Sequence, residues 1–191
     1  MIENIKKIDW ELFLFINSKH NAFFDSIMYY SSEKYFWIPF YTVLIIIIIK
    51  TYKRKSILIF IFISFLITLC DQTSNLFKNY FQRLRPSHEA SLSNLIHLNK
   101  AGVGGKYGFF SAHASNTFGL IVFLAMLLPY KYNYIKIVLI LWGLLVTYSR
   151  VYNGVHYPTD ILVGISIGAI YGYIFSILYK QINIYCYEKY R

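Results

Sequence analysis

The sequence contains little charge for its length. Only 15% of its 191 residues are Asp, Glu, Lys or Arg, whereas a soluble domain carries about a quarter. Acidic residues are the scarcest of these, with nine Asp and Glu against nineteen Lys and Arg and a formal net charge of +10. Hydrophobic residues make up 57% of the chain and aromatic residues 20%. This composition excludes an ordinary soluble domain and is typical of a membrane protein.

Cysteine is also scarce, and the N-terminus does not resemble a cleavable signal peptide. Cys70 falls inside an apolar run and Cys186 in the C-terminal tail, so we expect no disulfide between them. Glu3 and Glu11 interrupt the first apolar residues, and no small-residue cleavage pattern follows. The positive net charge does not indicate nucleic-acid binding, because the basic residues lie in loops between apolar runs, where membrane proteins and phosphate sites carry them.

Several apolar runs predict membrane-spanning helices. Residues 8–30 are apolar but interrupted at 17–21, so they fit either one poor span or an interfacial helix followed by a short re-entrant piece. The other predicted spans are 35–50, 56–81, 111–128, 134–149 and 159–179. We therefore expect an all-α fold, a polytopic membrane bundle of about six transmembrane helices. It forms one domain overall, in which an N-terminal segment, 1–34, precedes the membrane-embedded bundle, 35–191.

Small residues recur along the last predicted span. Gly164, Gly168 and Gly172 stand at every fourth position. Such a stripe lets a neighbouring helix approach closely, so we interpret it as a packing feature rather than a chemical one.

The basic residues predict which way the bundle faces. If the cluster from Lys50 to Lys55 is cytoplasmic, other basic residues fall on the same side, namely Lys131, Lys136, Lys180, Lys189 and Arg191. With about six spans, both termini are also cytoplasmic. The opposite face then carries Lys78, Arg83, Arg85, Lys100, Lys106 and Arg150. So many positive charges on an outer face indicate that an anion binds there.

The connection at 87–109 is long for a compact bundle, which is typical of a functional or mobile loop. Its four glycines make it pliable, and Lys100 and Lys106 make it basic. A lid over a phosphorylated headgroup and a flexible surface loop fit equally well. We interpret His88, His97 and Arg83 as loop surface, although Arg83 can also contact a second phosphate.

Three segments bring chemically active residues to the predicted outer face. They contain Lys78 and Arg85, then Ser111, Ala112 and His113, and finally Arg150, His156 and Asp160. The Asp160 carboxylate can orient the imidazole of His156, four residues earlier, which makes a ring nitrogen a nucleophile or a base. Pro158 suits the first turn of a helix, where anions are also favoured. Three cations, two histidines and a carboxylate at one rim suit phosphoryl transfer, which mainly needs positioning and charge neutralisation.

These segments resemble the three-part motif of the type 2 phosphatidic acid phosphatase family, which membrane lipid phosphatases share with soluble vanadium haloperoxidases. The matching residues are Lys78-x6-Arg85-Pro86, then Ser111-x-His113, then Ser149-Arg150-x5-His156-x3-Asp160. The second part departs from the family, because Phe110-Ser111-Ala112-His113 stands where Pro-Ser-Gly-His is usual. Ala112 still offers a backbone N–H to a phosphate.

The resemblance implies a role for each residue. His156 would be the nucleophile that forms a phosphohistidine, and Asp160 would hold its ring. His113 would protonate the leaving oxygen and then activate water. The phosphate oxygens would be bound by Lys78, Arg85, Arg150, Ser111 and Ala112. Because the three cations would neutralise the phosphate, we expect a metal-independent enzyme without a cofactor.

We therefore expect an integral membrane enzyme that hydrolyses a lipid phosphate or diphosphate at the outer face of the cytoplasmic (inner) membrane, towards the periplasm or cell exterior. Undecaprenyl diphosphate, cleaved to undecaprenyl phosphate, is the favoured substrate, from the resemblance to small bacterial members. Phosphatidylglycerophosphate, phosphatidate, lipid A and transfer of the phosphate to a second lipid are alternatives. A small transporter or scaffold is the non-enzymatic alternative, although transporters place charges near the midplane. The expected partners are a phosphorylated lipid and the bilayer, and the oligomeric state is left open.

Overall fold

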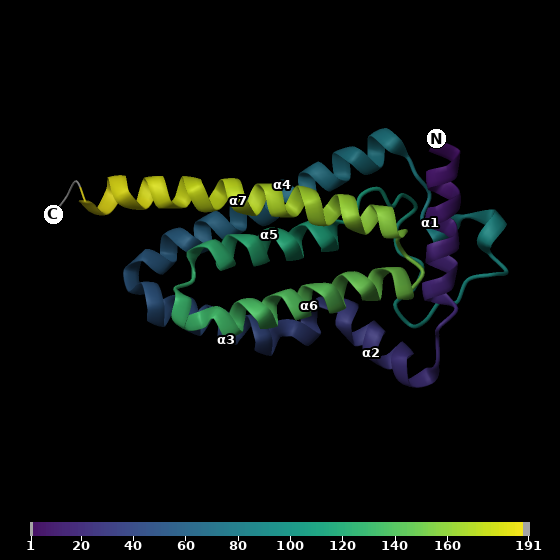
Figure 1. The fold of residues 1–191 in the computed structure, drawn as a ribbon, viewed down its shortest axis with the longest axis horizontal. Coiled ribbons are helices and arrows are strands. Elements are labelled where there is room, and N and C mark those ends of the chain that lie inside the picture. The colour runs from purple at the N-terminus through teal and green to yellow at the C-terminus, as the bar shows by residue number, and fades with distance from the viewer. Residues whose placement is uncertain (1, 189–191) are drawn as a thin grey trace.

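The computed structural model describes residues 2–188, which fold into helices without a β-strand (Figure 1). The α-helices are α1 (Ile2–Asn17), α2 (Ala22–Ser32), α3 (Ile38–Tyr52), α4 (Ser56–Phe81), α5 (Ala112–Leu127), α6 (Asn133–Tyr152) and α7 (Pro158–Glu188). Short 3-10 turns occupy Lys34–Trp37, Lys53–Lys55, Pro86–His88, Ala90–Leu92 and Tyr130–Tyr132. The prediction of an all-α bundle is confirmed.

Helices α3 to α7 run along the long axis of the molecule, whereas α1 lies across one end (Figure 1). The chain turns back between α3 and α4 at Lys53–Lys55, where Lys53 adopts a φ of 50°. Three helical stretches are long and apolar enough to cross a membrane: 34–81, which includes this turn, 130–152 and 158–183. The shorter apolar helix α5 lies among them. The protein is therefore embedded in a membrane and spans it several times.

Local sequence determines which helix ends meet at the end of the bundle that α1 covers (Figure 1). Helix α4 ends at Phe81 because Gln82 adopts a left-handed conformation, and the Gln82 N–H donates to the carbonyl of Lys78. Helix α7 begins with Pro158, whose fixed φ and missing N–H suit a first helical turn. The end of α4, the start of α5 and the turn from α6 to α7 therefore face α1.

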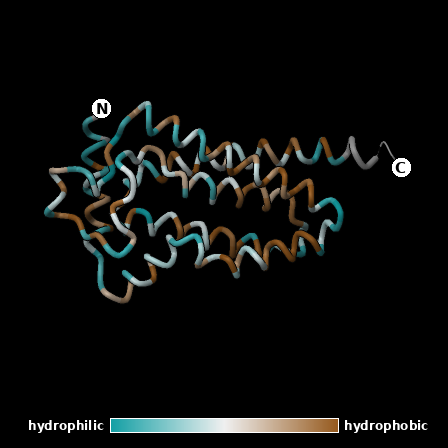
Figure 2. The backbone as a smooth tube through the Cα atoms, turned by 180° about the vertical axis from the view of Figure 1, so that it is seen from behind, coloured by the Kyte–Doolittle hydropathy of each residue, from teal (hydrophilic) through white to brown (hydrophobic). Residues whose placement is uncertain are grey.

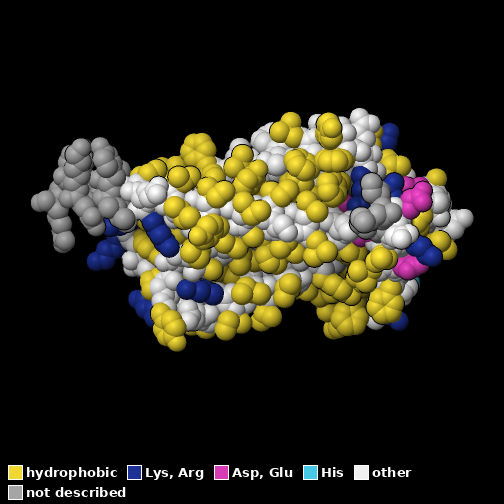
Figure 3. Space-filling model, turned by 45° about the horizontal axis from the view of Figure 1, so that its top comes forward, with side chains coloured by type: hydrophobic (Ala, Val, Ile, Leu, Met, Phe, Trp, Pro, Cys, Tyr) yellow, Lys and Arg dark blue, Asp and Glu magenta, His cyan; other side chains and the backbone are white. Residues whose placement is uncertain are grey.

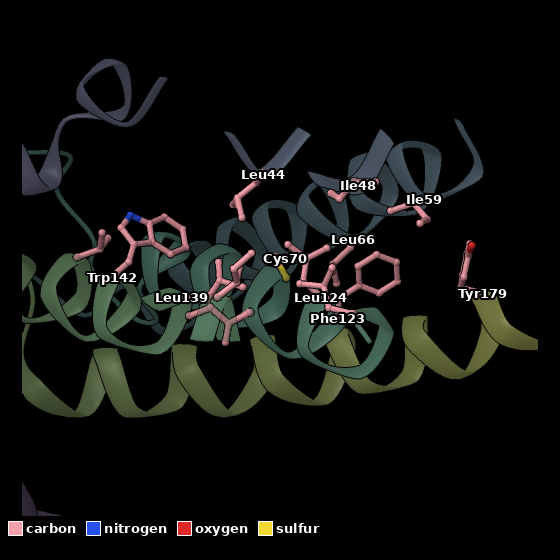
Figure 4. Close-up of a cluster of buried hydrophobic side chains, with 14 residues drawn as sticks. Leu44, Ile48, Ile59, Leu66, Cys70, Phe123, Leu124, Leu139, Trp142 and Tyr179 are labelled. Carbon is pink, nitrogen blue, oxygen red and sulfur yellow. The ribbon is translucent and has the colours of Figure 1, made fainter. Parts of the chain in front are cut away.

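The bundle is apolar both inside and along its sides. Its core draws side chains from α3 to α7: Leu44, Ile48, Ile59, Leu66, Cys70, Phe123, Leu124, Leu139, Trp142 and Tyr179 (Figure 4). Large apolar side chains such as Ile137, Leu141 and Leu162 point outward instead. Hydrophobic segments dominate the length of the bundle, and charged side chains gather near its two ends (Figures 2 and 3). An apolar belt between charged ends is what a bilayer requires.

The glycine stripe packs α7 against α5, as the sequence predicts. A Cβ atom at Gly164 would lie 2.6 Å from the carbonyl oxygen of Ser111, and one at Gly168 would overlap the carbonyl of Ser115. Gly172 faces the carbonyl of Gly119 in the same way. Because no larger residue fits these positions without moving α5, the stripe sets how deeply α5 sits in the bundle.

The region at 8–30, which the sequence left undecided, forms the two short helices α1 and α2 instead of one continuous span. Asn21 ends the break between them by accepting a hydrogen bond from the N–H of Phe24 at 2.9 Å. As a result, the first helix lies at the covered end of the bundle and α7 extends to the other end (Figure 1). The two ends of the described chain thus lie at opposite ends of the bundle, whereas the expectation of both termini on one side rested on a count of about six spans.

The connection at 87–109 packs against this end of the bundle. The N–H of His97 donates to Oδ1 of Asn17 at 2.7 Å, and the amide of Asn99 donates to Oδ1 of Asn153 at 2.7 Å. The imidazole of His97 contacts the carboxylate of Asp25 at 2.9 Å. The loop is thereby tied to α1, α2 and the end of α6, and His97 is a paired residue rather than free loop surface.

Candidate active site

His156 lies in the turn between α6 and α7 with 1% of its surface exposed. Gly154, whose φ is 75°, gives this turn a conformation that other residues rarely adopt. The Nδ1 atom of His156 lies 3.3 Å from Oδ2 of Asp160, and the same oxygen accepts the backbone N–H of Tyr157 at 3.1 Å. A proton held on Nδ1 by the carboxylate makes Nε2 the nucleophilic nitrogen.

Arg85 reaches the same point from the loop that follows α4. Its Nε donates to the carbonyl of Tyr107 at 3.2 Å, which holds the two parts of the loop side by side. Gly108 allows this close approach, because a Cβ there would lie 3.0 Å from Cγ of Arg85 and 3.1 Å from Oδ2 of Asp160. Burial lowers the pKa of the Arg85 guanidinium, and the negative charge of Asp160 opposes that shift. Arg85 is therefore a cation enclosed beside the histidine.

The pKa of His156 is held well below its ordinary value. Burial is the largest cause, since it disfavours the charged imidazolium. The positive charges of Arg85, Arg150 and Lys78 add to it, and a hydrogen bond to the backbone of Gly108 acts in the opposite direction. His156 is consequently neutral around pH 7, which is the form that can attack phosphorus.

The start of α5 and the end of α6 each add a buried donor that the protein itself does not use. Ser111 is fully buried, and its N–H donates to the carbonyl of Asp160 at 3.1 Å. The Ser111 hydroxyl and Nε of Arg150 are among the buried side-chain atoms of the described residues that have no hydrogen-bond partner. A buried donor without an acceptor is costly, so a pair of them beside His156 indicates that a ligand supplies the acceptor. Phosphate oxygens are acceptors of this kind.

The structure brings the predicted site residues to one end of the bundle. His113 occupies the first turn of α5. Arg150, Arg85 and Lys78 are its positively charged neighbours, and the neutral His156 also lies near it. Asp160, Ser111 and Ala112 lie at the same end of the bundle, so four helix ends and two loops supply the eight predicted positions.

A cavity of about 310 Å³ opens beside His113 and Ala112. Ser31, Ser32, Lys34 and Asp71 contribute to its polar part. It shares four lining residues, Tyr41, Asn116, Thr117 and Trp142, with an apolar cavity of about 430 Å³ between α3, α4, α5 and α6. The two cavities are therefore adjacent, one beside the start of α5 and the other inside the apolar part of the bundle.

Sequence reasoning missed the part that Arg83 plays. Its side chain donates to Oδ1 of Asp160 at 2.8 Å and pairs with Asp9, so it is not loop surface. The available signal was spacing, because Arg83 and Arg85 are two residues apart in an extended segment and can face the same side. Asp9 carried no comparable signal, since its contacts are far away in the sequence.

Asp71 precedes Lys78 by two turns of α4. Its Oδ1 accepts a hydrogen bond from the amide of Asn116 at 2.8 Å, so it joins α4 to α5. Within residues 2–188, no group of three His, Cys, Asp or Glu side chains is placed to hold a metal ion.

Known relatives share this architecture. The chain is 36% identical to a lipid A 4'-phosphatase of Bacteroides thetaiotaomicron, over 96% of this chain and 82% of that protein. It is 32% identical to a lipid A 4'-phosphatase of Porphyromonas gingivalis, over 100% and 78% of the two chains. An undecaprenyl-diphosphatase of Sulfolobus acidocaldarius is 31% identical over 83% and 72%. The crystal structure of Aquifex aeolicus LpxE superposes with a TM-score of 0.62 and 27% identity, covering 87% of this chain and 93% of that one.

A family model matches residues 56–184. This range contains every residue that the sequence predicts for catalysis or phosphate binding, from Lys78 to Asp160. The matched family is also the one that the three-part motif indicated, so that prediction is confirmed. The chain belongs to the PAP2 superfamily.

Proposed function

We propose that this membrane lipid phosphatase of the PAP2 superfamily removes a phosphate from a lipid A-like saccharolipid through a phosphohistidine on His156. The observation that carries the proposal is the pair of buried, unpartnered donors, on Ser111 and Arg150, beside a neutral histidine held by a carboxylate. Such a constellation is incomplete without an oxyanion, and it places a nucleophile next to one.

The residues divide the chemistry between them. Nε2 of His156 attacks phosphorus, and the bond from phosphorus to the lipid oxygen breaks as His113 gives that oxygen a proton. His113 then takes a proton from water, whose oxygen attacks the phosphohistidine and releases inorganic phosphate. Oxygens of the transferring group are held by Lys78, Arg85, Arg150, the Ser111 hydroxyl and the Ala112 N–H. We propose that these cations neutralise the phosphate without a metal.

The two adjacent cavities favour a lipid over a soluble phosphate ester. One has polar lining groups beside His113, and the other is apolar and lies within the bundle. A phosphate at the polar end and a hydrocarbon chain at the apolar end would match the substrate's two parts to the two environments.

The relatives favour lipid A among the possible lipids. The two lipid A 4'-phosphatases match at higher identity, and over more of this chain, than the undecaprenyl-diphosphatase does. This changes our preference from undecaprenyl diphosphate, which rested on resemblance to small bacterial members and not on a residue that recognises isoprenoid. The alternative substrates are undecaprenyl diphosphate, phosphatidylglycerophosphate and phosphatidate. Transfer of the phosphate to a second lipid is the alternative reaction.

The distribution of charge supports an outward-facing site in the inner membrane. The basic turn Lys53–Lys55 and Lys131 lie at the end opposite the site (Figure 1). Basic loops favour the cytoplasmic side, which leaves the site at the periplasmic or external face. The same reasoning places α1 on the side of the active site.

The proposal is tested with purified protein in chelator, by comparing phosphate release from lipid A, undecaprenyl diphosphate, phosphatidylglycerophosphate and phosphatidate. We expect lipid A to turn over fastest and His156→Ala to abolish release. His88→Ala is the matched control, because the side chain of His88 contacts the hydroxyl of the neighbouring Ser87 in the loop, at 3.2 Å. Release that persists in His156→Ala would overturn the nucleophile, and faster turnover of another lipid would overturn the substrate.

A further inference from the structure

The N-terminal helix reaches the candidate active site through one buried carboxylate. Asp9, on α1, is 2% exposed. Its Oδ1 accepts the N–H of Thr159 at 2.9 Å, and its Oδ2 accepts the Thr159 hydroxyl at 2.6 Å and Nη2 of Arg83. A buried carboxylate is tolerated only when it is paired and hydrogen-bonded in this way. Asp9 therefore joins α1 to the first turn of α7 and to Arg83.

Arg83 connects Asp9 to the residue that orients the nucleophile. Its Nη1 donates to Oδ1 of Asp160 at 2.8 Å, while Nη2 contacts Asp9. The guanidinium lies 4.2 Å from the ring centre of Tyr157, which fixes its plane. Because a guanidinium presents its donors in a rigid fork, carboxylates on both sides determine its direction. The other oxygen of Asp160 faces Nδ1 of His156.

We propose that Asp9 is a positioning residue for phosphoryl transfer. Asp9 fixes the guanidinium of Arg83, Arg83 in turn fixes the carboxylate of Asp160, and Asp160 aligns the imidazole of His156. The inference rests on the proposed role of His156 as the nucleophile. Asp9 lies outside residues 56–184, so the family match does not include it. Without Asp9, the guanidinium would have one carboxylate left and could turn towards Asp160. The imidazole would then lose its alignment with phosphorus, on which the rate depends steeply.

Steady-state kinetics of Asp9→Asn, Arg83→Gln and the double variant test this arrangement. We expect Asp9→Asn to lower kcat about tenfold while KM changes by less than about twofold, because Asp9 does not touch the substrate. The double variant should be no slower than Arg83→Gln alone, since both act through the same residue. The matched control is Asp25→Asn, another carboxylate near the N-terminus, which pairs with His97 and Tyr152 outside this network.

Each outcome discriminates. The positioning role would be overturned if Asp9→Asn kept the wild-type kcat, or if Asp9→Asn and Asp25→Asn lost the same share of kcat at the same melting temperature. It would also be overturned if the losses of kcat in the two single variants multiplied in the double variant. If Asp9→Asn does not accumulate, Arg83→Lys replaces it, because an ammonium lacks the rigid planar fork that faces both carboxylates. Unchanged kcat in Arg83→Lys also overturns the role. His156→Ala is measured alongside. An inactive His156→Ala with a normal Asp9→Asn rejects only this inference, whereas an active His156→Ala rejects the proposed function.

Discussion

Ser111 has a hydroxyl that the fold buries without using. Ser111 occupies the position before α5, where serine usually caps a helix, yet its side chain makes no capping hydrogen bond. The hydroxyl also has no other partner among the described residues. Burying this hydroxyl without a partner lowers the stability of the unliganded protein. The position is therefore consistent with a role in binding the substrate rather than in capping the helix.

Ser111→Ala should separate function from stability. We expect kcat/KM to fall about tenfold, because one hydrogen bond to a charged phosphate is lost. The melting temperature should stay the same or rise, since an unsatisfied buried hydroxyl is removed. Ser176→Ala, in which a buried hydroxyl loses its bond to the carbonyl of Tyr173, should instead lower stability and keep activity. A clear loss of stability in Ser111→Ala would contradict this account.

The lowered pKa of His156 also has a consequence for stability. In the unfolded chain this histidine binds a proton below about pH 6.5, whereas the folded protein resists protonation because the group is buried among cations. The unfolded state therefore binds more protons as the pH falls below that value, and folding loses stability by up to about 1.4 kcal/mol per pH unit. Melting temperatures of wild type and His156→Asn between about pH 5 and pH 7.5 check this. The variant should show the shallower decline, and parallel curves would count against it.

At the scale of elements, the contact between α5 and α7 positions the site. Ser111 and His113 are carried by α5, while Asp160 is carried by α7, and glycines let the two helices touch. Gly168→Ala should destabilise the protein by about 1–3 kcal/mol, because its Cβ would overlap the carbonyl of Ser115. Thermal unfolding measures the effect. Gly105→Ala is the control, because nothing lies within 4 Å of a Cβ there, and equal losses in both variants would argue against close packing as the cause.

The elements also show which features the sequence can predict. Apolar runs reveal α3 to α7, and motif spacing predicts the eight candidate site residues, because both signals are contained in short stretches of chain. The direction of α1 and the pairing of Asp9 with Arg83 depend on contacts between residues more than seventy positions apart, for which a single sequence has no local pattern. The role of the loop at 87–109 was undecided for the same reason, since the residues that hold it, Asn17 and Asn153, are far away in the sequence.

At the scale of the whole molecule, charge and hydrophobicity divide the bundle into an apolar belt and two unlike ends (Figures 2 and 3). One end carries the basic turn Lys53–Lys55, while the other carries the active-site cations together with acidic partners such as Asp9 and Asp160. Lys and Arg in short loops next to the ends of the spans favour the cytoplasmic side. The two ends should therefore face different compartments.

Labelling with a membrane-impermeant thiol reagent tests this topology. Cys186→Ser leaves Cys70, which is buried, so an added exposed cysteine gives the signal. Ser93→Cys lies in the loop beside the active site, and its side chain is exposed at the outward end. It should react in cells whose inner membrane is intact, once the reagent can pass the outer layers of the envelope. Lys53→Cys and Tyr130→Cys, exposed at the opposite end, should react only after the inner membrane is permeabilised. The reverse pattern would place phosphate release in the cytoplasm, and labelling of all three in intact cells would mean that the bundle axis does not cross the membrane.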